Sequence, residues 1–206
     1  MENTQSLVSE QHFGVQKNAS ETVEFENWEA AQQFFQIARK RLLDVNNWQT
    51  ICSGLSSTFI LRDNQGQSVG HRFPEVGDYF QIDIPGPGNA AGDGHDWVLV
   101  EAMEDRSDAG GDLTSIRVRP ASSPLNDQPD VAHFLDEAAT STFLVSRIGT
   151  SVTAEVHGRN EAANTHTDSL LDKVRNVATA VGAWLGFADV QWKSLAKALV
   201  DQEKQP

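Results

Sequence analysis

Alternating apolar and polar positions run through the middle of the chain and predict a series of β-strands. Phe80, Ile82 and Ile84 alternate with more polar neighbours, and the same period of two recurs in Leu113–Arg119. This alternation is typical of antiparallel strands that turn one face toward a core. The predicted strands are Glu21–Phe25, Ser57–Arg62, Tyr79–Ile84, Asp96–Met103, Leu113–Arg119, Thr142–Ile148 and Ser151–Asn160.

Helical spacing of apolar residues marks the two ends of this strand series. After Asn27, a suitable N-cap, one apolar stripe predicts a helix over Trp28–Leu43. A second stripe predicts a helical segment over Asp168–Leu199, either one bent helix or two helices meeting near Gly186. The stripe residues are Ala31, Phe34, Phe35, Ala38 and Leu42 in the first segment and Leu171, Val174, Ala178, Val181 and Leu185 in the second.

The remaining segments indicate loops and flexible ends. A short helix is expected over Val131–Ala139, and mobile loops are expected over Pro85–His95 and Ser107–Asp112. With 206 residues, a single core is the simplest arrangement. We expect a flexible leader over residues 1–20, one α+β domain over residues 21–201 and a flexible tail over residues 202–206.

The order of these elements resembles the helix-grip superfamily, which includes START lipid-transfer domains, plant pollen allergens and polyketide cyclases. The matching parts are the strand Glu21–Phe25, the helix Trp28–Leu43, the strands between Ser57 and Asn160, and the segment Asp168–Leu199. No motif accompanies this order. The resemblance implies an α+β fold in which a curved antiparallel sheet of six or seven strands grips a long C-terminal helix. It also implies an apolar ligand between them, and it transfers no catalytic residue.

Charge and cysteine content narrow the partners and the compartment. Lys and Arg number 16 against 29 Asp and Glu, a net charge of −13 that repels phosphate backbones and anionic membranes. Cys52 is the single cysteine, and the N-terminus lacks a signal-peptide pattern. We therefore expect a cytoplasmic protein without a nucleic-acid or membrane partner. The sequence is compatible with a protein partner and with an apolar or acidic small molecule as a ligand.

Metal and cofactor sites have no support in the spacing of residues. The six histidines form neither a His-x-His pair nor a His-Glu-x-x-His arrangement on a helix. The glycines between Pro85 and His95 lack the Gly-Lys-Ser/Thr ending of a phosphate-binding loop. We expect neither a metal nor a cofactor.

The densest polar group lies in the last predicted strand. Glu155, His157 and Arg159 share one strand face, and Arg147 lies across the hairpin from them. This face could orient a ligand carboxylate or transfer a proton; alternatively it is a solvated face with ordinary cross-strand pairs. With the arginine and aromatic residues of neighbouring elements, the ligand-binding candidates are Trp97, Arg117, Phe143, Arg147, His157, Arg159 and Trp184.

Three functions follow from these patterns. The preferred one is a ligand-binding domain, noncatalytic or weakly catalytic, with a largely apolar pocket between the sheet and the C-terminal helix. The first alternative is a protein-interaction module that uses the acidic residues between Asp93 and Asp112. The second is a small-molecule enzyme that uses His157 and its charged neighbours, although no nucleophile motif supports it.

Overall fold

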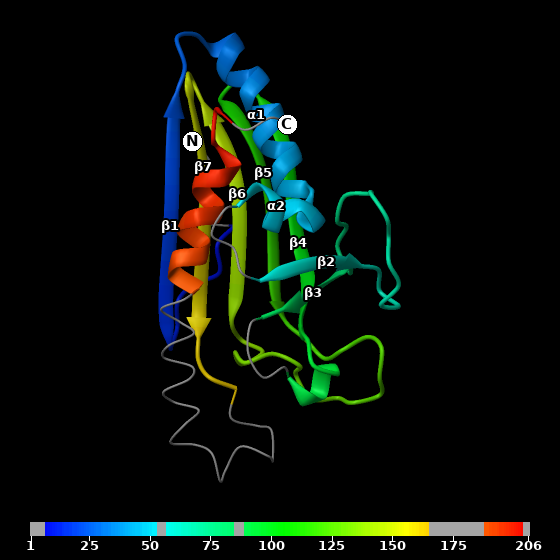
Figure 1. Cartoon of the computed structure of the whole chain (residues 1–206). Helices are drawn as coiled ribbons and strands as arrows, with labels where there is room; N and C mark the ends of the chain where they lie inside the picture. The colour runs from blue at the N-terminus through cyan, green and yellow to red at the C-terminus, as the bar shows by residue number, and fades with distance from the viewer. Residues whose placement is uncertain (1–6, 53–56, 85–88, 165–187, 204–206) are drawn as a thin grey trace.

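One antiparallel sheet forms the body of the molecule, and the helices lie on one of its faces (Figure 1). The structure is a computed structural model that describes residues 7–52, 57–84, 89–164 and 188–203. Seven strands follow the order β1-β7-β6-β5-β4-β3-β2, and each neighbouring pair is antiparallel. The predicted α+β class and antiparallel sheet are therefore confirmed.

The strands and the long first helix follow the expected order along the chain. The strands are β1 (Val15–Glu24), β2 (Thr58–Arg62), β3 (Tyr79–Asp83), β4 (Asp96–Asp108), β5 (Gly111–Pro120), β6 (Thr140–Ile148) and β7 (Ser151–Glu161). The short helices are η2 (Val45–Asn47), α2 (Trp48–Ile51) and η3 (Ala90–Gly92), and the long helix is α1 (Trp28–Leu43). Residues 188–199 are helical as well and are called the terminal helix below.

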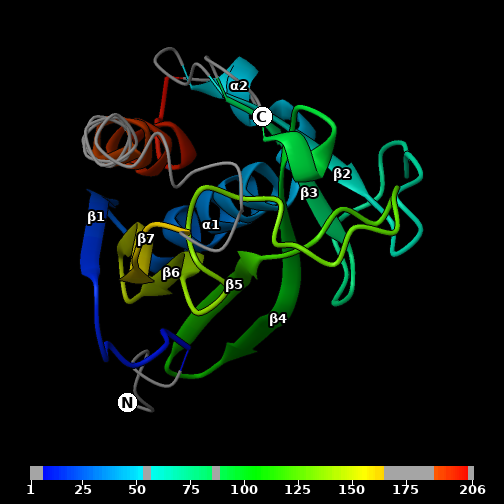
Figure 2. The ribbon, with the colours of Figure 1, turned by 90° about the horizontal axis from the view of Figure 1, so that it is seen from below.

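Helix α1 begins at Trp28, as its sequence predicts, and ends at Leu43. The Asn27 side-chain oxygen accepts a hydrogen bond from the Ala30 amide at 2.9 Å, which satisfies one of the unpaired donors of the first turn. The predicted apolar stripe is buried, with Ala31, Ala38 and Leu42 fully enclosed. Figure 2 shows α1 lying across β5 and β6, while the terminal helix lies beside β1 and β7.

The core lies between these helices and the sheet face turned toward them, here called the inner face. Strand register aligns Ile116, Phe143, Val156 and Ala19 in a row across four strands, and all four are buried in this core. Trp48 packs against the inner face, with its ring centroid 4.9 Å from that of Phe143. The period of two thus places apolar residues inward, as the alternation predicts.

The terminal helix packs on the same core through Leu195 and Leu199, which are fully buried. The rest of the segment predicted over Asp168–Leu199, including Gly186, lies outside the described residues up to residue 187. In the described part of the chain, no helix is long and apolar enough to cross a membrane.

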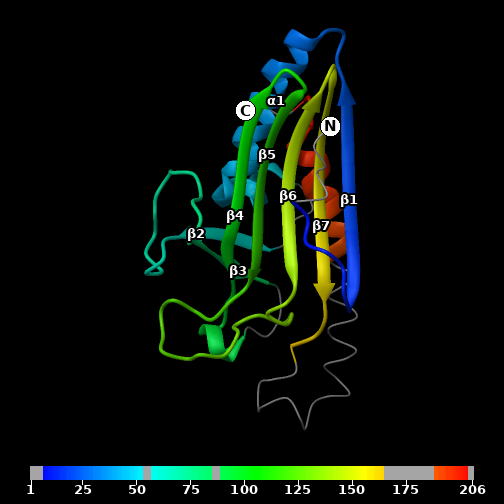
Figure 3. The same ribbon diagram turned by 180° about the vertical axis from the view of Figure 1, so that it is seen from behind.

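The first strand begins earlier than predicted, at Val15 rather than Glu21. Residues 15–20 therefore belong to the sheet, where Lys17 pairs with Gly158 and Ala19 with Val156 of β7. These residues were not predicted as a strand because they are mostly polar, and they are polar because one side of this edge strand is exposed. Residues 7–14 then cross β7 on the outer face of the sheet, opposite the helices (Figure 3).

Two further segments differ from their predictions. The stretch Ser107–Asp112 is a tight hairpin, since β4 continues to Asp108 and β5 begins at Gly111. The helix predicted over Val131–Ala139 is wrong. Its backbone is bound to neighbouring elements instead: the Ala132 carbonyl accepts from the Trp97 amide at 2.8 Å, and the Phe134 carbonyl accepts from the Asn164 amide at 2.9 Å. We call residues 131–139 the clasp loop.

Candidate functional site

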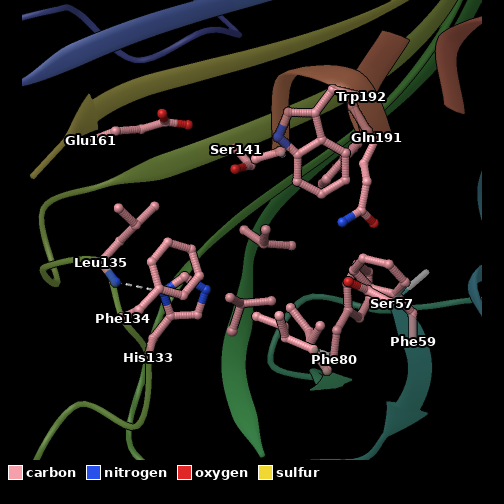
Figure 4. A pocket seen from close by; sticks show the side chains of 16 residues that line it. Ser57, Phe59, Phe80, His133, Phe134, Leu135, Ser141, Glu161, Gln191 and Trp192 are labelled. Atoms are coloured by element: carbon pink, nitrogen blue, oxygen red, sulfur yellow. Dashed lines mark hydrogen bonds between the residues drawn. The ribbon is translucent and has the colours of Figure 1, made fainter. Parts of the chain in front are cut away.

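A cavity of about 40 Å³ lies between the inner face, the clasp loop and the terminal helix (Figure 4). A single water molecule needs a cavity volume of roughly 10–15 Å³, so this cavity has room for several waters or a small organic group. Its walls are largely apolar, and the residues include Phe59, Phe80, Ile82, Val118, Phe143 and Trp192. The aromatic walls contact one another, with the rings of Phe143 and Trp192 5.2 Å apart.

Five polar side chains interrupt this apolar lining: Ser57, His133, Ser141, Glu161 and Gln191. They come from separate parts of the chain, namely the start of β2, the clasp loop, β6, the end of β7 and the terminal helix. A few convergent polar groups in an apolar hollow are typical of small-molecule sites.

Glu161 reaches the inner face because β7 contains a β-bulge. The period of two would place Glu161 on the outer face with Glu155, His157 and Arg159. However, register shifts between the pairs Lys17–Gly158 and Val15–Glu161, so that β7 carries one more residue than β1 there. Asn160 takes the left-handed conformation, with φ of 55°, and the next side chain turns inward.

The Asn160 side chain is also buried under residues 7–14. Its amide oxygen accepts a hydrogen bond from the His12 amide at 2.8 Å, and its amide nitrogen donates to the Glu10 carbonyl at 3.0 Å. Its backbone amide donates to the Gln11 side chain at 2.9 Å. The segment on the outer face therefore holds the bulge that directs Glu161 inward.

The Glu161 carboxylate is enclosed but incompletely bonded. Its side chain is 2% exposed, and Lys17 Nζ lies 4.0 Å from Oε2. Among the described residues, none donates a hydrogen bond to this oxygen. Burial raises the pKa of Glu161, and the positive charges of Lys17 and Arg159 oppose that rise. A side chain at Gly158 would place Cβ 2.2 Å from Oε1, so only glycine leaves room for the carboxylate.

His133 supplies a neutral polar group on the opposite wall. Burial lowers its pKa to about 3, so the imidazole is uncharged at neutral pH. Nδ1 accepts a hydrogen bond from the Leu135 amide at 3.0 Å, which leaves the proton on Nε2. Figure 4 shows Nε2 directed toward the cavity, and the ring packs against that of Phe134 at a tilt of 33°, with centroids 4.2 Å apart.

Asp96 anchors the clasp loop that carries His133. Its Oδ1 accepts a hydrogen bond from the Phe134 amide at 3.0 Å. Burial raises the pKa of Asp96 to about 7, with this hydrogen bond opposing the rise. From the other side, the Asn164 side chain donates to the carbonyls of Val131 and His133 at 3.2 and 3.1 Å. The loop is thus bound both by Asp96 of β4 and by Asn164.

Of the predicted ligand-binding residues, Phe143 lines this cavity. Trp97 is fully buried elsewhere, with its indole against Gly92 and its ring 6.3 Å from that of Tyr79. Trp184 lies outside the described residues.

The predicted arginines do not form the polar end of the cavity. Arg147 lies near the opposite end of β6, where it pairs with Asp112 and donates to the Gly149 carbonyl at 3.0 Å. Arg117 pairs with Glu101 and donates to the Leu7 carbonyl at 3.1 Å on the outer face. Each arginine therefore has a structural partner away from the cavity lining.

His157 and Arg159 also face outward, beneath residues 7–14. His157 Nδ1 lies 2.7 Å from the Asn18 side-chain oxygen, and its Nε2 lies 3.6 Å from Glu155. Arg159 donates to the carbonyls of Lys17 and Gly158. Together with residues 8–12, these side chains border an open polar hollow of about 560 Å³. Sequence periodicity grouped them correctly but could not show which face holds the cavity.

None of the five polar cavity residues was predicted from the sequence, and Glu161 and His133 are the two that matter most here. The signal for Glu161 was the run Gly158-Arg159-Asn160, because Gly and Asn are the residues that tolerate close approach and positive φ. His133 lay in a predicted helix and had no detectable signal. Within the described ranges, no group of three or more His, Cys, Asp or Glu residues could hold a metal ion.

Comparisons with known proteins identify similar structures but no related sequence. No protein-family model matches the chain, and no curated protein sequence matches it. An uncharacterized protein from Bacillus thuringiensis is 15% identical, with 91% of this chain and 100% of that chain covered and a TM-score of 0.41. Norcoclaurine synthase from Thalictrum flavum, in complex with dopamine and hydroxybenzaldehyde, is 11% identical, with 93% and 90% covered and a TM-score of 0.38.

The di-domain ARO/CYC protein BexL, from the BE-7585A biosynthetic pathway, is 14% identical, with a TM-score of 0.43. The match covers 93% of this chain and 51% of BexL, so the chain spans about half of that protein. At identities and TM-scores this low, these structures support no argument about function. The resemblance to the helix-grip superfamily stays a prediction.

Proposed function

We propose that this protein binds a small, largely apolar molecule between the inner face of the sheet and the terminal helix. The observation that carries the proposal is the apolar cavity with a buried carboxylate oxygen, Glu161 Oε2, that no described residue satisfies. Buried polar atoms in proteins nearly always have a partner, and a ligand can supply one.

The proposal is for binding and not for catalysis. Acid–base catalysis by histidine needs a pKa near neutrality, whereas the pKa of His133 is about 3. Cys52 is buried in the core and does not line the cavity. His157, the candidate for an enzymatic role, is held by Asn18 on the outer face.

The alternative of an acidic interaction surface has less support. Of the acidic residues between Asp93 and Asp112, Asp96 binds the clasp loop, Asp105 pairs with Arg39 and Asp112 pairs with Arg147. These carboxylates stabilise the fold and do not form one free acidic surface.

Titration with N-phenyl-1-naphthylamine, a neutral lipophilic dye, and with the smaller probes toluene and phenol tests the proposal. The dye is larger than the cavity of about 40 Å³, so its binding requires the cavity walls to move apart. We expect saturable binding near one to one, followed by the rise in dye fluorescence. Val118→Phe should weaken binding by at least about tenfold, because the larger ring fills apolar space in the cavity wall. Val190→Phe is the matched control, since Val190 is 60% exposed and should leave binding unchanged.

Two controls make the outcome decisive. Circular dichroism establishes that each variant is folded, and Ser141→Val provides a milder change in the same wall. If folded wild-type protein does not bind the dye, and small probes such as toluene and phenol also fail to bind, the proposed function is wrong.

A further inference from the structure

We infer that the bound molecule carries a hydroxyl group that donates its hydrogen to Glu161 Oε2, so that the ligand class is a small apolar alcohol or phenol. This inference rests on the proposed function and adds the chemistry that selects the ligand.

The Glu161 carboxylate is positioned to accept a hydrogen bond from a molecule in the cavity. The side chain is 2% exposed, and Figure 4 shows its carboxylate extending into the cavity toward Ser141. Oε2 receives no hydrogen bond from the described residues. A buried acceptor without a hydrogen bond raises the free energy of the folded protein, particularly when it is charged. A ligand that donates a hydrogen bond to it therefore gains more binding free energy than the same contact would give in water.

The fold holds this carboxylate in place before a ligand arrives. The absence of a side chain at Gly158 makes room for Oε1, and the bulge at Asn160 directs the residue inward. The His12 amide donates to the Asn160 side chain and the Gln11 side chain accepts from the Asn160 amide, and these two hydrogen bonds fix that bulge. A preorganised acceptor requires little rearrangement on binding, which favours a specific contact.

Charges around Glu161 favour a neutral donor over a cation. Lys17 and Arg159 already act on the carboxylate as positive charges, and Asp189 adds a negative one. A ligand ammonium would gain attraction from Glu161 but would meet the repulsion of Lys17 Nζ, 4.0 Å from Oε2. A ligand carboxylate would be repelled by Glu161 itself. A hydroxyl avoids both penalties and still forms a charge-assisted hydrogen bond.

The opposite wall does not change this selection. His133 is neutral and offers an Nε2 hydrogen, and the Gln191 and Ser141 side chains are uncharged. Ser57 adds one more uncharged polar side chain, and the remaining lining residues are apolar. The cavity therefore distinguishes ligands chiefly at Glu161.

Phenol and toluene are the probes that test the inference. Phenol carries a hydroxyl group where toluene carries a methyl group, and the two molecules are otherwise alike. Binding is followed by chemical-shift titration of the intact wild-type chain. We expect phenol to bind on the order of ten- to a hundredfold more tightly than toluene. Benzylamine and benzoate, titrated in the same way, should both bind more weakly than phenol.

Variants at Glu161 should remove this preference. Glu161→Met lacks an acceptor and should bring the phenol-to-toluene ratio close to one, while Glu161→Gln keeps a neutral acceptor and should give an intermediate ratio. Glu155→Gln is the matched control, because it makes the same change on the outer face of the same strand and should keep the wild-type ratio.

The outcomes separate the inference from the proposed function. Equal binding of phenol and toluene overturns the inference and leaves the proposed function standing. Tighter binding of benzylamine or benzoate than of phenol also overturns it, and so does a wild-type ratio that persists in folded Glu161→Gln or Glu161→Met. If none of the four probes and no dye binds, the proposed function itself fails.

Discussion

At the scale of single residues, two buried ionisable groups near the cavity have opposite responses to protons. The pKa of Asp96 is raised to about 7, so folding favours its protonated form below that pH. The pKa of His133 is lowered to about 3, so folding favours its neutral form above that pH. Between about pH 4 and 6.5, the unfolded chain therefore carries a proton on His133, whereas the folded chain carries one on Asp96.

Asp96→Asn should separate these two effects. The folded Asp96 carboxyl binds protons more tightly than the unfolded one, so its contribution to wild-type stability falls as pH rises from about 4 to 7. Asparagine keeps the acceptor for the Phe134 amide and does not titrate. We expect the variant to be more stable than wild type at pH 8 by up to about 3–4 kcal/mol, and this advantage should vanish near pH 4.

Urea unfolding of both proteins at pH 4, 6 and 8 measures this difference. On acidification, protonation of His133 in the unfolded chain lowers stability, and in the wild type protonation of folded Asp96 offsets this loss. Asp96→Asn lacks the offset, so the stability of the variant should fall more steeply than that of wild type between pH 6.5 and 4. A stability difference that does not change with pH would show that Asp96 is ionised in the folded protein.

At the scale of elements, the bulge in β7 and the segment that covers it act together. Asn160 has φ of 55°, a conformation that asparagine adopts more readily than most residues but less readily than glycine, and its side chain holds residues 10–13 on the outer face. Of the expected flexible leader, residues 15–20 belong to β1, and residues 7–14 are held against the outer face of the sheet. Its hydrogen bonds offset the unfavourable backbone conformation of Asn160.

Two substitutions at Asn160 distinguish the contribution of its side-chain hydrogen bonds from the cost of its backbone conformation. Asn160→Gly and Asn160→Ala both remove the side-chain hydrogen bonds, but alanine alone retains the cost of the left-handed conformation. We expect both variants to lose stability, and alanine to lose about 1 kcal/mol more than glycine. Urea unfolding provides the measurement, and equal losses would argue against a strained bulge.

At the scale of the whole molecule, a buried arginine joins the two helices that cover the sheet. Arg41, near the end of α1, is 4% exposed. Its Nη1 donates to the carbonyls of Leu199 and Asp201 at 3.1 and 2.8 Å, at the C-terminal end of the terminal helix. Arg41 therefore connects α1 to the C-terminal end of the terminal helix and fixes the helix that walls the cavity.

Arg41→Ala should therefore destabilise the protein by about 2–4 kcal/mol and weaken binding of the dye. Arg39→Ala is a matched control on the same helix. Its pair with Asp105 is partly exposed to solvent, so its loss should cost less than about 1 kcal/mol and leave dye binding unchanged. Thermal unfolding and the dye titration provide the two readouts. Similar losses for both variants would show that Arg41 does not hold the terminal helix.

The sequence by itself determined the elements whose signals are local. The alternation of Phe80 and Ile82 and the stripe through Phe34, Phe35 and Leu42 repeat at the period of their own backbone, so the sheet strands and α1 could be predicted from neighbouring residues. The α+β class and the antiparallel sheet follow from the order of these elements.

Tertiary contacts decided the features that form the site. The clasp loop is not helical because β4 and residues 162–164 bind its backbone, and these partners are distant in sequence. Glu161 faces the cavity because Asn160 adds a residue to β7, which reverses the side given by a period of two. A single bulge changes the face of one carboxylate without changing any hydrophobic pattern, and therefore only the folded structure shows where the cavity and its polar group meet.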